Sequence, residues 1–178
     1  MDKNGMTPEF SFAVPLSEIG GKAVLHRLVT DATQRAALAK RFALLSLQSL
    51  SAEVSLARDG EVISAQGKLA AELSQACVAT GSPVKAKVAE SFDIRFVTDG
   101  AKHALYAEIE LGESDCDTMF HDGRIIDLGE VVAQTLGLAI NPYPRIPNAD
   151  TALKNAGVKG EHEAGPFAAL AALRQDSD

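Results

Sequence analysis

Residues 51–73 read SAEVSLARDGEVISAQGKLAAEL, and this stretch decides the predicted fold. Apolar residues alternate with polar ones on both sides of Asp59-Gly60. Alternation with a period of two is typical of a strand with one buried face, and Asp-Gly is a strong signal for a two-residue hairpin turn. The stretch therefore predicts a β-hairpin with Asp59 and Gly60 as its loop.

The predicted loop also fixes the register of this hairpin. It sets Leu56 opposite Ile63, Val54 opposite Ala65 and Ala52 opposite Gly67. Both strands then direct their apolar side chains to the same face, so the turn and the alternation agree.

Further strands are predicted on either side of the hairpin. Alternation continues through Leu73, returns between Val84 and Phe96, and again between Leu105 and Leu111. Residues 10–16 are typical of an edge strand that ends near Pro15. Residues 113–123 are predicted to form an acidic loop. The pattern indicates an antiparallel meander with one solvated face.

Two helices are predicted from their capping residues. Asp31 with Gln34, and Asp127 with Glu130, have the spacing of a capping box. The face of the first helix is predicted to hold Arg35, Leu38, Ala39, Phe42 and Leu45, and the buried face of the second Leu128, Val131, Val132 and Leu136. The second helix should end before residues 141–147, where three prolines favour an extended chain.

The predicted fold class is therefore α+β, with an antiparallel β-meander of four or more strands and two main helices packed on one face. The 178 residues suggest one domain over residues 1–147. Residues 148–178 are predicted to be an extended tail with a short amphipathic helix near 166–174.

Composition excludes several classes of protein. Two cysteines cannot build a disulfide framework, and no apolar run is long enough for a transmembrane helix. We therefore expect a cytoplasmic protein with no membrane contact. Phosphate-binding and hydrolase motifs are absent from the sequence. Asp115, Cys116, Asp117, His121 and Asp122 could form a weak metal site. A solvated acidic loop is the favoured interpretation, and no metal or cofactor is expected.

The charge is unevenly distributed along the chain. The whole sequence carries −7, and residues 103–130 alone hold eight acidic residues and one basic residue. Residues 22–41 hold five basic residues and one acidic residue. Net charge argues against tight non-specific nucleic-acid binding, but the basic region could still face RNA.

Four segments, taken together, resemble one protein family. They read AKRFALLSLQSLSAEV at 39–54, AELSQACVATGSPV at 71–84, IDLGEVVAQTLGLAINPYPR at 126–145 and GPFAALAAL at 165–173. In this order they are similar to the YceD family of bacterial proteins, the large ribosomal RNA subunit accumulation proteins, in its alphaproteobacterial branch.

The resemblance implies a non-enzymatic factor that supports synthesis, processing or stability of large-subunit (23S) ribosomal RNA during ribosome assembly. An alternative is an acidic module that binds basic ribosomal proteins without touching RNA. Many members of the family carry Cys-x-x-Cys where this chain has Cys77 and Thr80. A zinc or redox role for that motif is doubtful here, because a lone thiol cannot supply a tetrahedral site.

Basic residues and one aromatic residue are the candidate contacts with RNA or another partner. They are Lys22, Arg27, Lys40, Arg41, Lys85, Lys87, Tyr143 and Arg145. A ring beside a guanidinium can stack on an unpaired base, although Tyr143 could equally pack its own segment onto the sheet. The outward Lys68, Lys85, Lys87 and Arg95 could instead form a solvated face paired to Asp93 and Glu90. Phe167, Leu170 and Leu173 are predicted to dock the tail on the body or on a partner.

Overall fold

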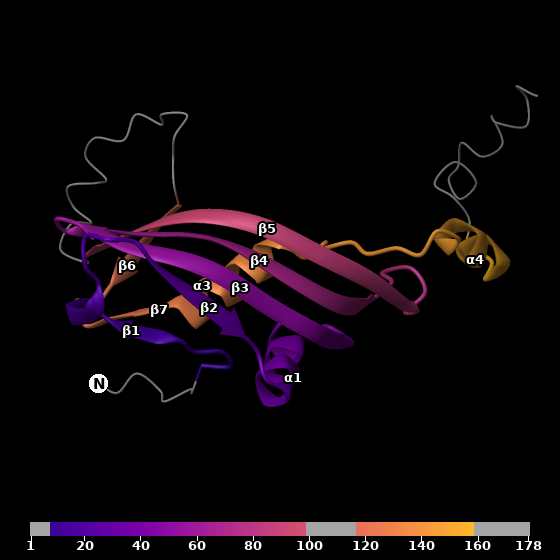
Figure 1. Cartoon of the computed structure of the whole chain (residues 1–178). Helices are drawn as coiled ribbons and strands as arrows, with labels where there is room; N and C mark the ends of the chain where they lie inside the picture. Colours follow the sequence, from indigo (N-terminus) through magenta and orange to yellow (C-terminus); the bar gives the residue numbers. More distant parts are fainter. Residues whose placement is uncertain (1–7, 99–116, 159–178) are drawn as a thin grey trace, which may run out of the picture. The chain divides into compact units, whose positions relative to one another are not determined.

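The computed structural model describes residues 8–98 and 117–158 (Figure 1). Its strands are β1 (Ala13–Pro15), β2 (Val24–Val29), β3 (Ser46–Asp59), β4 (Val62–Ala76), β5 (Pro83–Thr98), β6 (Asp117–His121) and β7 (Ile125–Asp127). Its helices are the short 3₁₀ turn η1 (Leu16–Glu18) and the α-helices α1 (Ala32–Arg41), α3 (Leu128–Ala139) and α4 (Ala149–Asn155). The described residues fall into a sheet unit, residues 8–74, 85–98 and 117–141, and a tip unit, residues 75–84 and 142–158.

A mostly antiparallel sheet forms the sheet unit, in the order β2-β3-β4-β5-β6. β3 is antiparallel to both β2 and β4, whereas β6 is parallel to β5. β1 and β7 pair separately as a small antiparallel sheet. The predicted α+β class is confirmed. The predicted strand at 105–111 lies outside the described residues, and β6 replaces part of the acidic loop predicted at 113–123.

The predicted hairpin register was wrong by two residues. Leu56 faces Ala65 and Asp59 faces Val62, so the loop consists of Gly60 and Glu61. Gly60 adopts a φ of +60°, as the first loop position of a type II′ turn requires. Because side chains alternate with a period of two, a shift of two residues leaves every side chain on its predicted face.

The chain between β1 and β3 differs most from the prediction. β2 was not predicted, and α1 ends at Arg41 instead of continuing through Leu45. The capping box at α1 is confirmed. The backbone amide of Gln34 donates to the Asp31 carboxylate at 2.8 Å, and the backbone amide of Asp31 donates to the side-chain oxygen of Gln34 at 2.9 Å. The helix ends because Ala43 takes a φ of 51° and turns the chain into β3.

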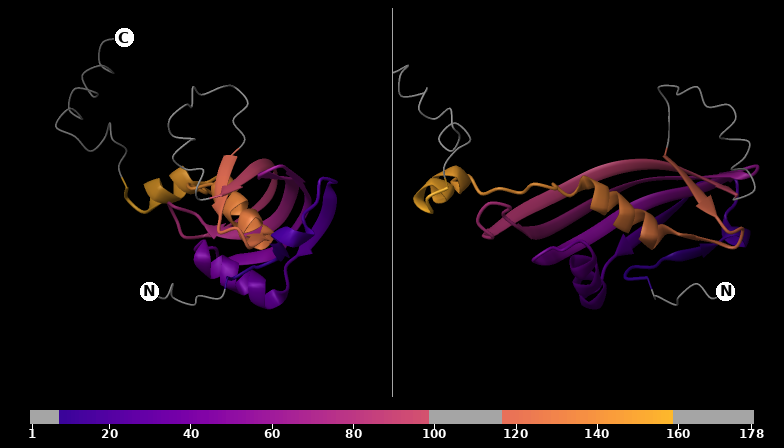
Figure 2. Two further views of the ribbon diagram at one scale, coloured as in Figure 1. Left: turned by 90° about the vertical axis from the view of Figure 1, so that its left-hand side faces the viewer. Right: turned by 180° about the vertical axis from the view of Figure 1, so that it is seen from behind.

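The second helix, α3, packs against the concave face of the sheet (Figure 2). The Asp127 carboxylate caps it by accepting from the Gly129 and Glu130 amides, as predicted. The same carboxylate accepts from the Phe12 amide at 2.8 Å, so it also holds the segment before β1. The four predicted apolar residues of α3 are all buried.

Gly129 and Gly137 allow α3 to approach its neighbours closely. A Cβ on Gly129 would lie 2.6 Å from the Phe10 carbonyl oxygen, and a Cβ on Gly137 would lie 2.8 Å from the Phe42 ring. Side chains at these two positions would therefore push α3 away from the segment before β1 and from the residue that follows α1.

The tip unit joins the loop between β4 and β5 to the segment that follows α3. The Val78 amide donates to the Pro144 carbonyl at 2.9 Å, and Cys77 is buried. Residues 149–155 form α4, where an extended tail was predicted. The predicted helix near 166–174 lies outside the described residues, and the predicted domain division stays a prediction. Among the described helices, none has the length and hydropathy to cross a bilayer.

Candidate nucleic-acid interface

The side chains of β2 to β5 that point away from the core form a solvated surface, which we call the outer face. Their neighbours along each strand are largely buried in the core, so the alternation assigns these side chains to the opposite side of the sheet. The outer face includes Leu25, Arg27, Val29, Ser51, Glu53, Ser55, Gln66, Lys68, Ala70, Glu72, Lys85, Lys87, Ala89, Ser91, Asp93 and Arg95.

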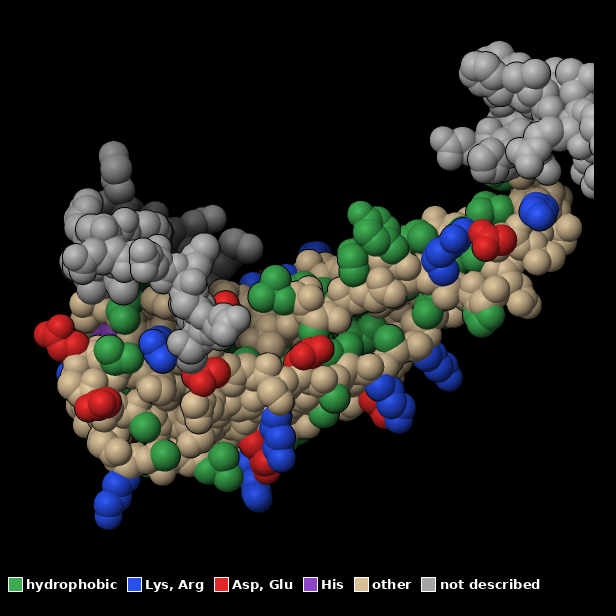
Figure 3. Space-filling view, turned by 90° about the horizontal axis from the view of Figure 1, so that it is seen from above, with side chains coloured by type: hydrophobic (Ala, Val, Ile, Leu, Met, Phe, Trp, Pro, Cys, Tyr) green, Lys and Arg blue, Asp and Glu red, His purple; other side chains and the backbone are tan. Residues whose placement is uncertain are grey.

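Basic residues outnumber acidic residues on the outer face. The basic residues are Arg27, Lys68, Lys85, Lys87 and Arg95, and the acidic residues are Glu53, Glu72 and Asp93. In the space-filling view, basic side chains project beside acidic ones, and other basic side chains project alone (Figure 3). This face therefore has the opposite sign to the chain as a whole, which carries −7.

A three-residue ion-pair cluster crosses three strands of the outer face. The Glu53 carboxylate lies 3.2 Å from Arg27 Nε and 3.2 Å from Lys68 Nζ. The hydrogen bond from Lys68 is the main cause that lowers the pKa of Glu53. The three residues lie directly opposite one another in the register. The predicted register placed Glu53 opposite Gln66, which is why the sequence did not reveal this cluster.

A shallow groove of about 580 Å³ lies beside this cluster. Its lining includes Arg27 and Lys68, the carboxylates Glu53 and Glu90, and the hydroxyl groups of Ser51 and Ser91. The groove therefore offers hydrogen-bonding groups, but its two cations are balanced by two carboxylates.

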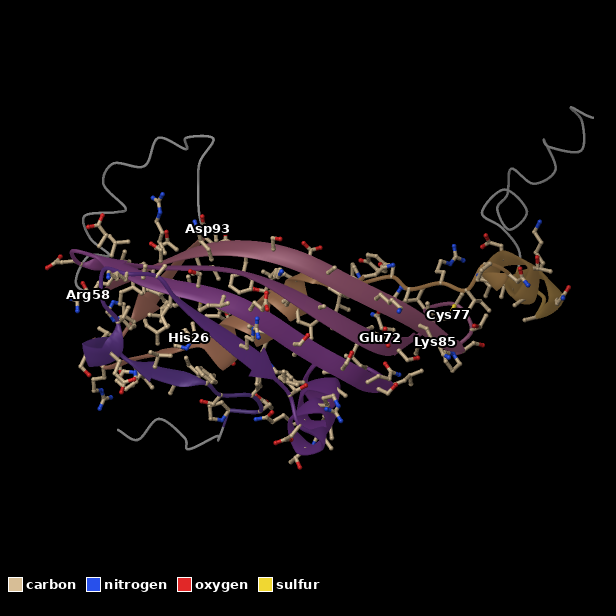
Figure 4. The ribbon with its side chains drawn as sticks, in the orientation of Figure 1. His26, Arg58, Glu72, Cys77, Lys85 and Asp93 are labelled. Carbon is tan, nitrogen blue, oxygen red and sulfur yellow. The ribbon has the colours of Figure 1, made fainter. Side chains whose placement is uncertain are left out.

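A second hollow of about 280 Å³ lies farther along the same face, where β3, β4 and β5 meet. Lys85, Lys87 and Glu72 line it, and Lys87 Nζ lies 2.7 Å from the Glu72 carboxylate. That hydrogen bond raises the pKa of Lys87 and lowers the pKa of Glu72. Glu72 and Lys85 lie toward one end of the sheet and Asp93 toward the other (Figure 4). Lys85 is exposed and makes no ion pair with a described residue.

The predicted acidic partners of the outer-face lysines were wrong. Lys68 pairs with Glu53 and Lys87 with Glu72, whereas Asp93 accepts a hydrogen bond from Gln66 at 2.8 Å. The prediction relied on acidic residues of β5, whereas the observed partner of Lys68 lies on β3 and that of Lys87 lies on β4.

The remaining candidate contacts do not share this face. Lys22 precedes β2, and Lys40 lies near the end of α1; both are exposed and neither has an ion-pair partner among the described residues. Arg41 makes a bidentate ion pair with Glu130, which raises the pKa of Arg41 and occupies its guanidinium.

Tyr143 and Arg145 belong to the tip unit. Tyr143 is 74% exposed, and Arg145 donates to the Asp150 carboxylate at 2.8 Å. The candidate tail residues Phe167, Leu170 and Leu173 lie outside the described residues. The structure therefore places Arg27, Lys85 and Lys87 from the candidate contacts on one face, the outer face, which also holds Lys68 and Arg95. Lys85 and Arg95 lie toward opposite ends of β5.

Most of the acidic residues described between positions 117 and 130 have a structural role. Asp122 accepts from the Arg124 amide, which lowers its pKa, and Asp127 caps α3. His121 is buried and accepts through Nδ1 from the Gly123 amide. Over residues 8–98 and 117–158, no three metal-binding side chains gather at one place. Asp115 and Cys116 lie outside these residues.

Comparison with known proteins places the chain in a family. Residues 65–174 match the family described as large ribosomal RNA subunit accumulation protein YceD. This match includes three of the four segments that carry the resemblance, and the segment at 39–54 lies before it. No curated protein and no solved structure matches the chain. Because the match covers more than half of the sequence, the chain belongs to the YceD family.

Proposed function

We propose that this protein is a non-enzymatic factor that supports synthesis, processing or stability of large-subunit ribosomal RNA, and that its outer face contacts that RNA. Membership of the YceD family supports the link to ribosomal RNA accumulation. The observation that supports the surface is the basic surplus on the outer face of a chain whose net charge is −7.

The side chains available on the outer face define the kind of contact. Ammonium and guanidinium groups bind phosphate oxygens, and serine hydroxyls hydrogen-bond to phosphate or ribose. Of the described outer-face residues, none is aromatic, so this surface lacks the rings on which single-strand binders stack unpaired bases. The contact we propose is therefore with the sugar-phosphate backbone.

Binding of a labelled large-subunit ribosomal RNA fragment across a salt series tests the proposal. Lys85→Ala with Arg95→Ala removes two outer-face cations that have no ion-pair partner among the described residues. Each lost phosphate contact should lower the slope of log K against log salt by about 1. Lys40→Ala is the matched control, because Lys40 is exposed but lies on α1. A slope unchanged by the double variant would overturn the proposed surface.

A deletion strain tests the cellular role. Loss of the protein should lower large-subunit ribosomal RNA relative to small-subunit RNA, and the wild-type chain should restore it. Normal levels in the deletion strain would contradict the proposal. If the purified protein binds basic ribosomal proteins and no RNA, the acidic-module alternative is the better account.

A further inference from the structure

We propose that β2 is a self-association edge, through which two copies of this chain pair antiparallel and join their sheets. The proposal rests on the backbone, exposure and charge of β2. Leu25, Arg27 and Val29 also belong to the outer face, but self-association through the edge does not require that face to bind RNA.

The backbone of β2 presents a row of hydrogen-bonding groups at the open edge of the sheet. β2 is the terminal strand of the order β2-β3-β4-β5-β6, and β3 is its one partner among the described strands. The Thr30 amide donates to the Leu50 carbonyl at 3.1 Å, so even-numbered residues direct their backbone groups toward β3. Because these directions alternate along an antiparallel strand, Leu25, Arg27 and Val29 direct theirs toward the edge.

The side chains of β2 are unusually apolar for an exposed edge. Val24, Leu25 and Val29 are 49%, 57% and 75% exposed. Natural sheets protect such edges with lysines, prolines, bulges or very short strands. β2 has six residues, contains no proline, and follows the β3 register without a shift. Its one charged side chain is Arg27, so the edge is open to another strand.

A second copy fits this edge better than a nucleic acid or a highly charged protein. The edge carries one cation, Arg27, which shares the Glu53 carboxylate with Lys68. The cluster therefore keeps a single net positive charge, which is little for a polyanion or a polycation to recognise. Antiparallel pairing about a two-fold axis at Arg27 sets Leu25 of one copy opposite Val29 of the other. These apolar pairs form twice and cover the exposed side chains.

The two-fold axis places the two Arg27 side chains opposite each other. Glu53 reduces the repulsion between them. Like charges directly opposite destabilise a strand pair. Each guanidinium keeps the carboxylate of its own Glu53, so the two cations at the axis are flanked by two anions that offset part of their repulsion. Glu53→Gln should therefore weaken association without changing the apolar contacts.

Sedimentation analysis of the full chain over a concentration series tests self-association. The wild-type chain should form dimers, and Leu25→Lys with Val29→Lys should raise the dissociation constant at least about tenfold, since lysines block strand addition. Leu138→Lys is the matched control, because Leu138 is 86% exposed on α3 and away from the edge. Unchanged thermal unfolding of the variants shows that they fold. A wild-type chain that stays monomeric, or a control equal to the edge variant, overturns the proposal.

Disulfide trapping tests the direction of pairing. Residues 25 and 29 of opposite copies would form a pair with Cα atoms about 5.5 Å apart, a distance that a disulfide spans. A mixture of the Leu25→Cys and Val29→Cys chains should cross-link to each other faster than either does to itself. The wild-type chain, with its own cysteines, gives the background. Faster cross-linking of Leu25→Cys to itself, or capture of a different protein at these positions, contradicts the antiparallel dimer.

Discussion

The Arg41 guanidinium donates two hydrogen bonds to the Glu130 carboxylate, at 2.9 and 2.8 Å, and joins the end of α1 to the first turn of α3. Glu9 adds a third carboxylate contact to Arg41 at 3.3 Å. Both side chains of the main pair are about 30% exposed, so the pair is only partly shielded from solvent. The helices on the concave side of the sheet are thus linked by charge as well as by packing.

We expect removal of this ion pair to destabilise the fold. Arg41→Met and Glu130→Gln should each lower the free energy of unfolding by about 1–2 kcal/mol, because a bidentate, partly buried ion pair stabilises a fold more than an exposed pair does. Urea denaturation measures the change. The double variant should lose less than the sum of the two single variants, since each already breaks the same contact; full additivity would contradict a direct pair.

The same pair should make stability depend on pH. The hydrogen bond from Arg41 holds the pKa of Glu130 below its ordinary value of 4.5 in the folded protein. The stabilisation is therefore complete above pH 4.5 and is lost as the pH falls through the folded pKa. The difference in unfolding free energy between the wild-type chain and Glu130→Gln should shrink on acidification. A difference that is constant between pH 7 and pH 3 would contradict this assignment.

The two close-packed glycines of α3 should respond differently to alanine. At Gly129 the added Cβ meets backbone atoms of residues 10–12, within 2.8 Å of each, whereas at Gly137 its three nearest atoms all belong to the Phe42 ring. Gly129→Ala should lower the free energy of unfolding by about 1–3 kcal/mol through overpacking. Gly137→Ala should lower the free energy of unfolding by clearly less. The half-buried Phe42 ring can move, and Ala is more favourable than Gly within a helix by about 1 kcal/mol. Equal losses would show that backbone contact is not the cause.

Cys77 should ionise near neutral pH. The hydrogen bond from the Thr80 side chain, with backbone amides of Ile146, Ala79 and Thr80, lowers the pKa of the thiol to about 7. Thr80→Val should raise that pKa, because the largest stabilising contact to the thiolate is lost. Thiolate absorbance across pH, in a Cys116→Ser background, measures it. Since the pKa is depressed in the folded state, the Thr80 contribution to stability should be larger at pH 9 than at pH 6.

Local patterns in the sequence predicted much of the sheet unit. The alternation from Ala52 to Phe96 assigned the buried and exposed faces of β3, β4 and β5 over most of their length. It fails near the end of β4, where Leu73, Ser74 and Gln75 are all buried. Asp31 and Asp127 marked the starts of both main helices. These features depend on neighbours in the sequence, where periodicity and capping are strong signals.

Features that depend on pairing or on chain reversal were not predicted. Asp59 and Gly60 were predicted to form the loop, but the turn consists of Gly60 and Glu61. The resulting two-residue error in register concealed the ion-pair cluster at Glu53. β2 lacks clear alternation, because it carries apolar residues on both faces, with Val24 and Leu28 on one face and Leu25 and Val29 on the other. Its sequence therefore carried no strand signal. Arg41 was assigned to the candidate interface because its sequence neighbours are basic, and its partner Glu130 is 89 positions away.

The contacts of Asp127 have a consequence for how the chain is made. This carboxylate and β7 hold the segment that begins at Ser11, more than a hundred positions earlier in the sequence. A growing chain is synthesised from its N-terminus. The β3–β4 hairpin can therefore form soon after its residues leave the ribosome, whereas β1 must wait until positions 125–127 emerge. The first strand to be synthesised is thus among the last to find its partner.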